Sequence, residues 1–453
     1  MRKELAVPQD FLDLLSATEG IFYGDIESQQ VRAICTDSRE CEVGDVFFAL
    51  RGKNFDGNNF IPEAIKRGAI PVGNGVGRYG IRVDSADTAL LSFAAYYKNA
   101  LPNLRHTVAI TGSVGKTTTK EFLHKITNKE YKTHATWGNY NNKIGVSMTV
   151  LSAPKDTEVL ILEMGMNHSG EIKNMASKIK ADTAIITKIG TSHIGYLENI
   201  ENIAKAKLEI TCGLQGELII PKNEPLLKCN YEKVSCFSSD DIGANISIIK
   251  NRFDKLELYI GGSLYSFFDF PSKAEHIRQC LAAAVAGALK LGISKDKILE
   301  GIKNIKQNIF RHKILNSRSG FLILDDSYNS SYESLTAALE TLKEVKYIGK
   351  ASALIGDILE LGNKSAAIHY KMGKLLAAAD LEYLFLVGEH IKETAKGAID
   401  DGFDKTRIFL YSQDIQRQNI AKQIIDTLTP ADALLVKASH GMKLKNIIEI
   451  ISE

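Results

Sequence analysis

A glycine-rich segment carries the residue types that hold phosphate groups. It reads Thr111-Gly112-Ser113-Val114-Gly115-Lys116-Thr117-Thr118 and completes an apolar run at 107–111 that predicts a strand. Glycines let backbone N–H groups converge on phosphate oxygens, and the start of a helix favours negative charge. Lys116 can reach terminal phosphates, and the hydroxyl of Thr117 can ligate magnesium. Ile110 occupies the first glycine position of the usual GxxxxGK[ST] pattern, so this is the shorter TGxxGKT variant.

Two further side chains stand where a metal beside the nucleotide would need ligands. Glu163 follows the apolar run 159–162, and His193 lies in the loop after the run 184–187. Ligands of open parallel sheets bind beyond the carboxyl ends of the strands, so both side chains are candidates for a magnesium site. Each also has an ordinary interpretation, as a solvated loop acid and as a surface histidine.

Lys207 lies within a predicted helix that begins near Asn199. One face of this helix is mostly apolar and contains Ile200, Ile203, Ala204, Lys207, Ile210, Thr211 and Leu214. Burial would lower the pKa of this amine and favour the neutral form, which can react with carbon dioxide to give an anionic carbamate. The alternatives are that Lys207 extends its charge to the surface or pairs with a buried acid.

The alternation of predicted strands and helices indicates an α/β protein. At about 150 residues per domain, 453 residues predict three domains. Residues 1–103 form a small N-terminal α/β domain, with a short strand at 45–50 and a helix at 86–99. Residues 104–310 form a central P-loop ATPase domain with a mostly parallel sheet. Residues 311–453 restart the alternation and predict a Rossmann-like domain.

Other segments refine this picture. The more polar interval 222–270 predicts antiparallel hairpins appended to the central sheet, and an alanine-rich helix is expected at 277–291. The strands expected in the last domain are 321–324, 353–355, 383–387, 407–411 and 433–436.

Composition excludes several classes of protein. The apolar fraction of 44% and charged fraction of 24% are those of an ordinary folded chain. Lys and Arg number 56 against 54 Asp and Glu, so a net charge of +2 offers no overall basic field for nucleic acid. Six cysteines without a CxxC pair fit a reducing cytosol. Since no export signal and no apolar window of about 18 residues is visible, we expect a cytoplasmic protein without a membrane span.

Further short motifs lie along the whole chain. They are Thr36-Asp37-Ser38-Arg39, Gly44-Asp45-Val46-Phe47-Phe48-Ala49-Leu50, Phe55-Asp56-Gly57, Gly138-Asn139-Tyr140-Asn141-Asn142, Glu163-Met164-Gly165-Met166-Asn167-His168, Ala204-Lys205-Ala206-Lys207, Asp325-Asp326-Ser327-Tyr328-Asn329 and Gly356-Asp357-Ile358-Leu359-Glu360-Leu361-Gly362. Together with TGSVGKTT, they resemble the motifs of the Mur ligases of peptidoglycan synthesis. The C-terminal motifs look most like those of the member that adds D-alanyl-D-alanine to a UDP-muramoyl tripeptide.

This resemblance implies an ATP-dependent amide-forming ligase. Such an enzyme transfers the γ-phosphoryl group of ATP to the terminal carboxylate of UDP-N-acetylmuramoyl-tripeptide. The amine of D-alanyl-D-alanine then attacks the acyl phosphate and gives the UDP-muramoyl-pentapeptide. We expect a monomer. Two alternatives are another Mur ligase paralogue that adds a single amino acid, and a non-catalytic protein that uses nucleotide as a switch.

The resemblance also implies roles for individual residues. Those expected to contact ATP are Gly112, Ser113, Val114, Gly115, Lys116, Thr117 and Thr118 in the central domain, with Arg311, Asp326 and Asn329 in the C-terminal domain. Those expected to hold the UDP-muramoyl substrate are Asp37, Ser38, Arg39, Asn139 and Asn142. His276 and Gln279 stand where the family often has asparagines near adenine, so the adenine contacts are left open.

A two-magnesium site is the last implication. Thr117 and Glu163 would bind one ion, and Glu163, His193 and a carbamylated Lys207 would bind the second. The carbamate would form from carbon dioxide. Lys116, His193 and Lys207 are the residues expected to be catalytic.

Overall fold

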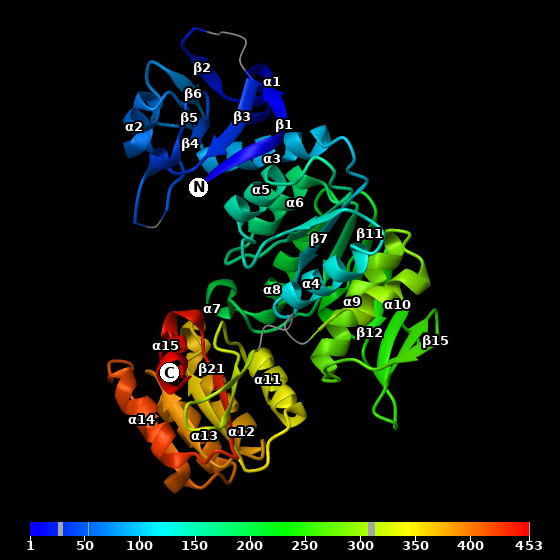
Figure 1. The fold of residues 1–453 in the computed structure, drawn as a ribbon, viewed down its shortest axis with the longest axis vertical. Helices are drawn as coiled ribbons and strands as arrows, with labels where there is room; N and C mark the ends of the chain where they lie inside the picture. Colours follow the sequence, from blue (N-terminus) through cyan, green and yellow to red (C-terminus); the bar gives the residue numbers. More distant parts are fainter. Residues whose placement is uncertain (26–29, 53, 307–312, 453) are drawn as a thin grey trace.

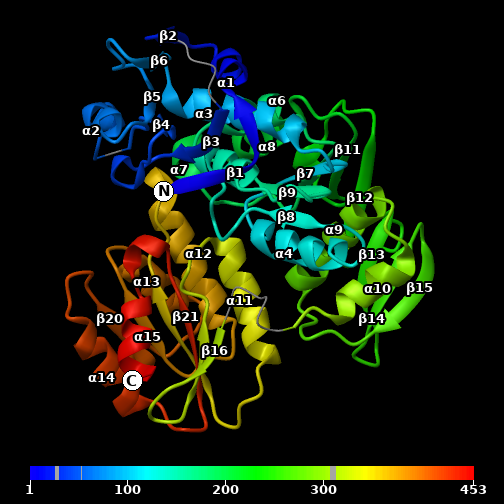
Figure 2. The ribbon, with the colours of Figure 1, turned by 45° about the horizontal axis from the view of Figure 1, so that its top comes forward.

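The protein has three mixed α/β domains that follow one another along its longest axis (Figure 1). This computed structural model describes residues 1–25, 30–52, 54–306 and 313–452. In the view of Figure 2, the N-terminal and C-terminal domains lie on the left of the central domain. The predicted three-domain α/β class is confirmed.

The described part of the N-terminal domain forms a six-stranded sheet in the order β1-β3-β4-β5-β6-β2. Strands β3 to β6 run parallel, and β1 and β2 pair antiparallel at the two edges. The strands are β1 (Arg2–Asp10), β2 (Ile21–Tyr23), β3 (Gln30–Cys35), β4 (Val46–Phe48), β5 (Ile70–Gly73) and β6 (Gly80–Arg82), and the helices are α1 (Phe11–Thr18), α2 (Ile61–Lys66) and α3 (Ala86–Ala100). Every residue of β4 is buried, as expected for a parallel strand covered on both faces.

The described part of the central domain forms a nine-stranded sheet in the order β15-β14-β13-β12-β11-β10-β7-β9-β8. Its strands are β7 (His106–Thr111), β8 (Thr133–Ala135), β9 (Val159–Glu163), β10 (Thr183–Ile186), β11 (Glu217–Pro221), β12 (Val234–Ser238), β13 (Ile246–Lys250), β14 (Leu256–Ile260) and β15 (Ser263–Phe268). Its helices are α4 (Lys116–Thr127), α5 (Lys143–Leu151), α6 (Glu171–Ile179), α7 (Ile194–Leu197), α8 (Ile200–Leu208), α9 (Glu275–Lys290) and α10 (Lys295–Lys303). Two apolar cores cover the two faces of this sheet.

The described part of the C-terminal domain forms a six-stranded sheet in the order β16-β17-β21-β18-β19-β20. Only β16 pairs antiparallel among these strands. The strands are β16 (Lys313–Asn316), β17 (Leu322–Asp325), β18 (Ala351–Gly356), β19 (Leu384–Val387), β20 (Ile408–Tyr411) and β21 (Ala433–Lys437), and the helices are α11 (Tyr332–Glu344), α12 (Ser365–Ala377), α13 (Ile391–Asp400), α14 (Arg417–Thr427) and α15 (Lys445–Ser452). This sheet matches the predicted strands closely.

Two expectations need correction. Antiparallel hairpins over 222–270 are correct for β13, β14 and β15, but β12 runs parallel to both β11 and β13. The helix that carries Lys207 begins after Asn199, whose side chain caps it, but ends at Leu208 and continues only as a short 3₁₀ turn. Across the ranges that the structure describes, no helix has both the length and the apolar character to span a membrane.

Sheet topology places the predicted site residues at one edge. Strands β10, β7 and β9 are parallel neighbours. The glycine loop follows β7, Glu163 ends β9, and the loop with His193 follows β10. Because the carboxyl ends of parallel neighbours share an edge, three segments that lie far apart in sequence converge there.

Candidate functional site

The glycine loop is held in shape by the loop that follows β10. Gly112 and Gly115 have φ values of 148° and 84°, which favour glycine, and a Cβ on Gly112 would meet the Thr187 hydroxyl. That hydroxyl donates to the Val114 carbonyl at 2.5 Å, and the Ser113 hydroxyl donates to the Gly190 carbonyl at 3.1 Å. The loop is therefore braced before any phosphate binds.

Helix α4 begins at Lys116, directly after the loop. The Lys116 ammonium folds back and donates to the Gly112 carbonyl at 2.7 Å. Backbone N–H groups at the start of a helix and this ammonium together give a site for an anion. The predicted strand, loop and helix order is confirmed.

Glu163 is fully buried, and both of its carboxylate oxygens accept hydrogen bonds. The Thr117 hydroxyl donates to Oε2 at 2.8 Å, and the Asn141 amide donates to Oε1 at 2.8 Å. Burial contradicts the alternative of a solvated loop acid. Asn141 was not among the predicted site residues, although it lies in the motif that contains Asn139 and Asn142. The structure thus joins the glycine loop to β9 through a carboxylate.

Lys207 is 1% exposed, which contradicts the alternative that its charge extends to solvent. Burial, and then the positive charge of Lys116, lowers the pKa of Lys207 well below its usual value, while the charge of Glu163 opposes this shift. The amine is thereby favoured in its neutral form.

His193 lies between β10 and α7 with a left-handed φ of 65°. Its Nδ1 lies 2.9 Å from Oε2 of Glu360, a residue of the C-terminal domain. Burial lowers the pKa of His193, and the charges of Lys116 and Lys207 lower it further. A carboxylate can only accept, so Nδ1 carries the proton and Nε2 is left with a lone pair. His193 is thus partly buried and pairs with a carboxylate of another domain.

Of the four predicted metal ligands, Thr117 and Glu163 share a hydrogen bond, and His193 follows β10 at the same edge of the sheet. Over the ranges that the structure describes, no group of three or more His, Cys, Asp and Glu side chains could hold a metal ion. Glu163 and His193 would need Thr117 and Lys207 to complete a ligand set. Carboxylate and hydroxyl oxygens suit magnesium, and a carbamate on Lys207 would add a further oxygen donor. The chemistry of these donors fits the expected ion.

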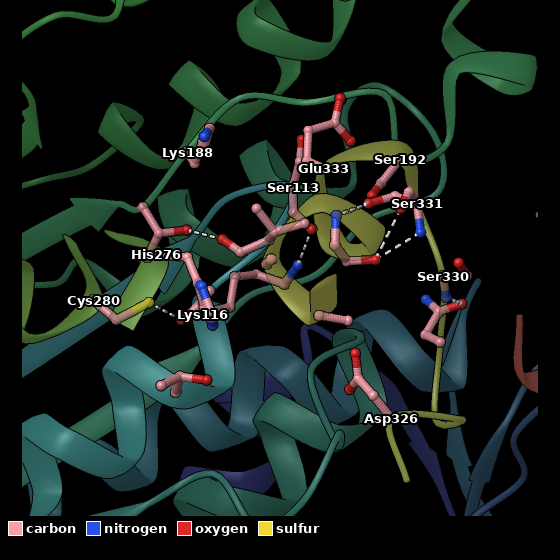
Figure 3. A pocket seen from close by; sticks show the side chains of 18 of the residues that line it. Ser113, Lys116, Lys188, Ser192, His276, Cys280, Asp326, Ser330, Ser331 and Glu333 are labelled. Carbon is pink, nitrogen blue, oxygen red and sulfur yellow. Dashed lines mark hydrogen bonds between the residues drawn. The ribbon is translucent and has the colours of Figure 1, made fainter. Parts of the chain in front are cut away.

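A cleft of about 1190 Å³ opens beside the glycine loop and is shared with the C-terminal domain (Figure 3). Central-domain residues that line it include Ser113, Val114, Gly115, Lys116, Thr118, His276 and Gln279. C-terminal residues that line it include Asp326, Asn329, Glu333 and Lys437. Asp326 and Asn329 thus face the cleft from the C-terminal domain, and His276 and Gln279 lie on the wall from α9. Arg311 lies outside the described residues.

Lys437 organises the C-terminal wall of this cleft. Its side chain is 2% exposed. Its ammonium contacts Oδ2 of Asp326 at 2.5 Å and donates to the Asn329 carbonyl at 2.9 Å. Lys437 is not among the predicted site residues, although a lysine at the end of the apolar strand β21 is a signal in the sequence.

A second hollow of about 800 Å³ lies in the N-terminal domain and is lined by Thr36, Asp37, Ser38, Arg39, Phe47, Leu50, Phe55, Gly57, Phe60 and Glu63. Arg39 donates to both carboxylate oxygens of Asp37, and these hydrogen bonds hold the pKa of Asp37 well below its usual range. The Ser38 hydroxyl donates to Glu63 at 2.9 Å. The three predicted residues therefore share one hollow with aromatic walls.

The two predicted asparagines of the central domain are exposed. The Asn142 side chain accepts from the Gly145 N–H at 2.8 Å and so caps α5. Asn139 lies in the preceding turn, where its carbonyl accepts from Asn141. Asn142 thus has a structural task besides any contact with substrate.

A P-loop that opens into a cleft between two α/β domains is the arrangement of nucleotide-dependent enzymes that close on their substrates. Comparison with known proteins supplies the family. Residues 110–282 match the Mur ligase middle domain, residues 311–440 the Mur ligase glutamate ligase domain, and residues 30–73 the Mur ligase family catalytic domain. The chain belongs to the Mur ligase family.

Curated relatives and solved structures agree with this family. The UDP-N-acetylmuramoyl-tripeptide–D-alanyl-D-alanine ligase of Bacillus subtilis (strain 168) is 32% identical over 94% of either chain. The ligase of the same name from Escherichia coli (strain K12) is 29% identical over 97% of this chain and 98% of its own. Crystal structure I of MurF from Acinetobacter baumannii has a TM-score of 0.87, 28% identity and 99% coverage of both chains. MurF ligase from Thermotoga maritima in complex with ADP has a TM-score of 0.79, 25% identity and coverage of 92% of this chain and 96% of its own.

Proposed function

We propose that this chain is an ATP-dependent ligase that joins D-alanyl-D-alanine to UDP-N-acetylmuramoyl-tripeptide. The observation that carries the proposal is the hydrogen bond from Thr117, which follows the glycine loop, to buried Glu163, beside an interdomain cleft that the glycine loop lines. Relatives with this activity in their names match the chain over almost its full length. A nucleotide switch has no need of a buried lysine and a histidine beside its phosphate loop.

The chemistry needs an activated carboxylate, because hydroxide is a poor leaving group. The γ-phosphoryl group of ATP passes to the terminal carboxylate of the tripeptide, which gives an acyl phosphate and ADP. The neutral amine of the dipeptide attacks the acyl carbon, the amide forms, phosphate leaves and the amine loses a proton. Lys116 stabilises the charge that spreads over the transferred phosphoryl group, and the glycine-loop N–H groups position it.

Two magnesium ions and a carbamate on Lys207 belong to this proposal. Thr117 and Glu163 would hold one ion, and Glu163, His193 and carbamylated Lys207 the other. When bound, the ions neutralise phosphate charge during transfer. Asp326, Asn329 and Arg311 would contact the nucleotide from the C-terminal domain. Through these contacts the C-terminal domain would close over the nucleotide and exclude water from it.

The remaining assignments are also proposals. Asp37, Ser38 and Arg39 would hold the uridine nucleotide, and Asn139 and Asn142 would orient the muramoyl part. The domain limits are 1–103, 104–310 and 311–453, and the enzyme acts as a monomer. A cytoplasmic location fits the nucleotide substrates. No disulfide joins any of the six cysteines, all of which the structure describes.

One assay tests the ligase proposal. Purified protein receives ATP and magnesium in two separate reactions. One contains the UDP-muramoyl tripeptide and D-alanyl-D-alanine, and the other contains a UDP-muramoyl peptide and the single amino acid meso-diaminopimelate. We expect phosphate release and a pentapeptide mass only with the dipeptide. Product with the single amino acid instead would identify a paralogue with another acceptor. Nucleotide binding without any ligated product would support the alternative of a non-catalytic protein that uses nucleotide as a switch.

A further inference from the structure

The loop that carries His193 is held by two carboxylates from the C-terminal domain. Glu333 accepts from the backbone N–H and the hydroxyl of Thr191, at 2.9 and 3.0 Å. Glu360 contacts Nδ1 of His193 at 2.9 Å, and its carbonyl accepts from the Gly195 N–H at 2.9 Å. Figure 1 shows α7, which follows this loop, extending toward the C-terminal domain. Neither carboxylate was expected at the site.

Around Glu360 the two domains meet backbone to backbone. A Cβ built on Gly195 would lie 2.4 Å from the Glu360 carbonyl oxygen and 2.7 Å from the Gly362 nitrogen. Glu360 and Gly362 have left-handed φ values of 64° and 53°. A left-handed φ is unfavourable for glutamate and persists only where its surroundings stabilise it. The turn is therefore shaped to fit this glycine.

We infer that Glu360 is a positioning residue that aligns His193 when the C-terminal domain docks. It accepts the Nδ1 proton, fixes the tautomer and leaves Nε2 available as a ligand in the site. The contact joins two domains, so docking and alignment of the imidazole occur together. For its effect on turnover, this inference rests on the proposed ligase function.

We expect Glu360 to act on the orientation of the His193 ring and not on the stability of the fold. Glu360 is 41% exposed on its side chain, and exposed ion pairs contribute little to folding. A carboxylate on the second nitrogen of a metal-binding histidine fixes the ring and raises its basicity, and its loss commonly costs about 10- to 100-fold in metal affinity or activity. Here this carboxylate belongs to a different domain from the histidine.

The tautomer of His193 is the direct test. Protein labelled with ¹⁵N at histidine is compared by NMR as wild type, Glu360→Ala and the control Asp426→Asn, an exposed carboxylate of α14. The His193→Gln spectrum assigns the signal. We expect a protonated Nδ1 in the wild type and the control, and loss of that state in Glu360→Ala. An unchanged His193 signal in Glu360→Ala would overturn the inference.

Kinetics separate positioning from nucleotide binding. We expect Glu360→Ala to lower kcat about 10- to 100-fold while the KM for ATP changes less than about three-fold. Glu360→Gln keeps an oxygen acceptor and should restore most of the loss. Gly195→Ala should lower kcat without altering the carboxylate, since its Cβ meets the Glu360 carbonyl. A kcat within about two-fold of wild type for Glu360→Ala would contradict the inference.

The two readouts also distinguish this inference from the ligase proposal. If the wild-type protein forms no ligated product, the proposed function fails, yet the NMR comparison still decides whether Glu360 fixes His193. If ligation is normal and Glu360→Ala changes neither readout, only the positioning role fails.

Discussion

The two walls of the ATP cleft are built on different principles. On the central-domain side, Glu163 and Lys207 are buried and lie on elements of one continuous core. On the C-terminal side, the loop that carries His193 is contacted by the partly exposed carboxylates of Glu333 and Glu360. The first wall is preformed by the fold, and the second becomes part of the site only by docking. We therefore expect substitutions in the first wall to abolish chemistry and those in the second to alter alignment or nucleotide affinity.

The largest effect is expected for Lys116→Ala. This change removes the ammonium that stabilises charge on the transferred phosphoryl group, and we expect kcat to fall on the order of 10² or more. Phosphate release in the ligation assay measures it. Lys125→Ala, an exposed lysine of the same helix, is the matched control. Near-normal turnover of Lys116→Ala would contradict the role that we assign to the glycine loop and its lysine in phosphoryl transfer.

Lys207→Met tests the buried part of the preformed wall. The substitution keeps volume and removes the amine, so we expect kcat to fall on the order of 10² without loss of folding, because no unpaired charge is left behind. Thermal unfolding and turnover are measured together, with exposed Lys205→Met as the control. We also expect wild-type activity to decline when carbon dioxide is removed and to return with bicarbonate. Turnover by Lys207→Met at the wild-type rate would contradict a ligand role for this lysine.

Asp326→Asn addresses the docked wall at its nucleotide contact. It removes the carboxylate that faces the buried ammonium of Lys437, which should destabilise the C-terminal domain by about 1–3 kcal/mol. We expect the KM for ATP to rise about ten-fold with a smaller change in kcat. Denaturant unfolding and a nucleotide titration measure the two effects. A fall in kcat with unchanged KM would place Asp326 in the chemistry instead.

The smallest effect is expected for Glu333→Gln. The amide oxygen can still accept from the Thr191 N–H, and the lost ionic character contributes little at a partly exposed position. Steady-state kinetics should therefore show changes in kcat and KM below about three-fold. A loss as large as that of Lys207→Met would mean that the docked wall is as important to catalysis as the preformed one.

The sequence predicts the preformed wall better than the docked one, for physical reasons. The order of strand, glycine loop and helix is local, and Lys207 on an apolar helix face signals burial by spacing alone. Glu163 and His193 follow apolar strands, so topology predicts their shared edge. The contact between Glu360 and His193 could not be predicted in this way, because the two residues are 167 positions apart and no local sequence pattern indicates that they touch.

Local contacts also explain details in which the structure differs from the sequence-based expectations. Asn141, which was not among the predicted site residues, donates to Glu163, and its neighbour Asn142 caps α5. The helix of Lys207 ends at Leu208, whereas the apolar pattern continues to Leu214. Glu209, the first residue after this helix, accepts hydrogen bonds from the Gly170 and Lys173 N–H groups at the start of α6. Tertiary contacts of this kind override helical periodicity.

A crystal structure with magnesium and a non-hydrolysable ATP analogue would test the central claim most directly. We predict density for a carboxyl group beyond Nζ of Lys207 and two ions, with oxygen ligands at about 2.0–2.1 Å that include Thr117 and Glu163. Lys207 as a bare amine, with His193 and Glu163 on separate sides of the nucleotide and no ion between them, would contradict it.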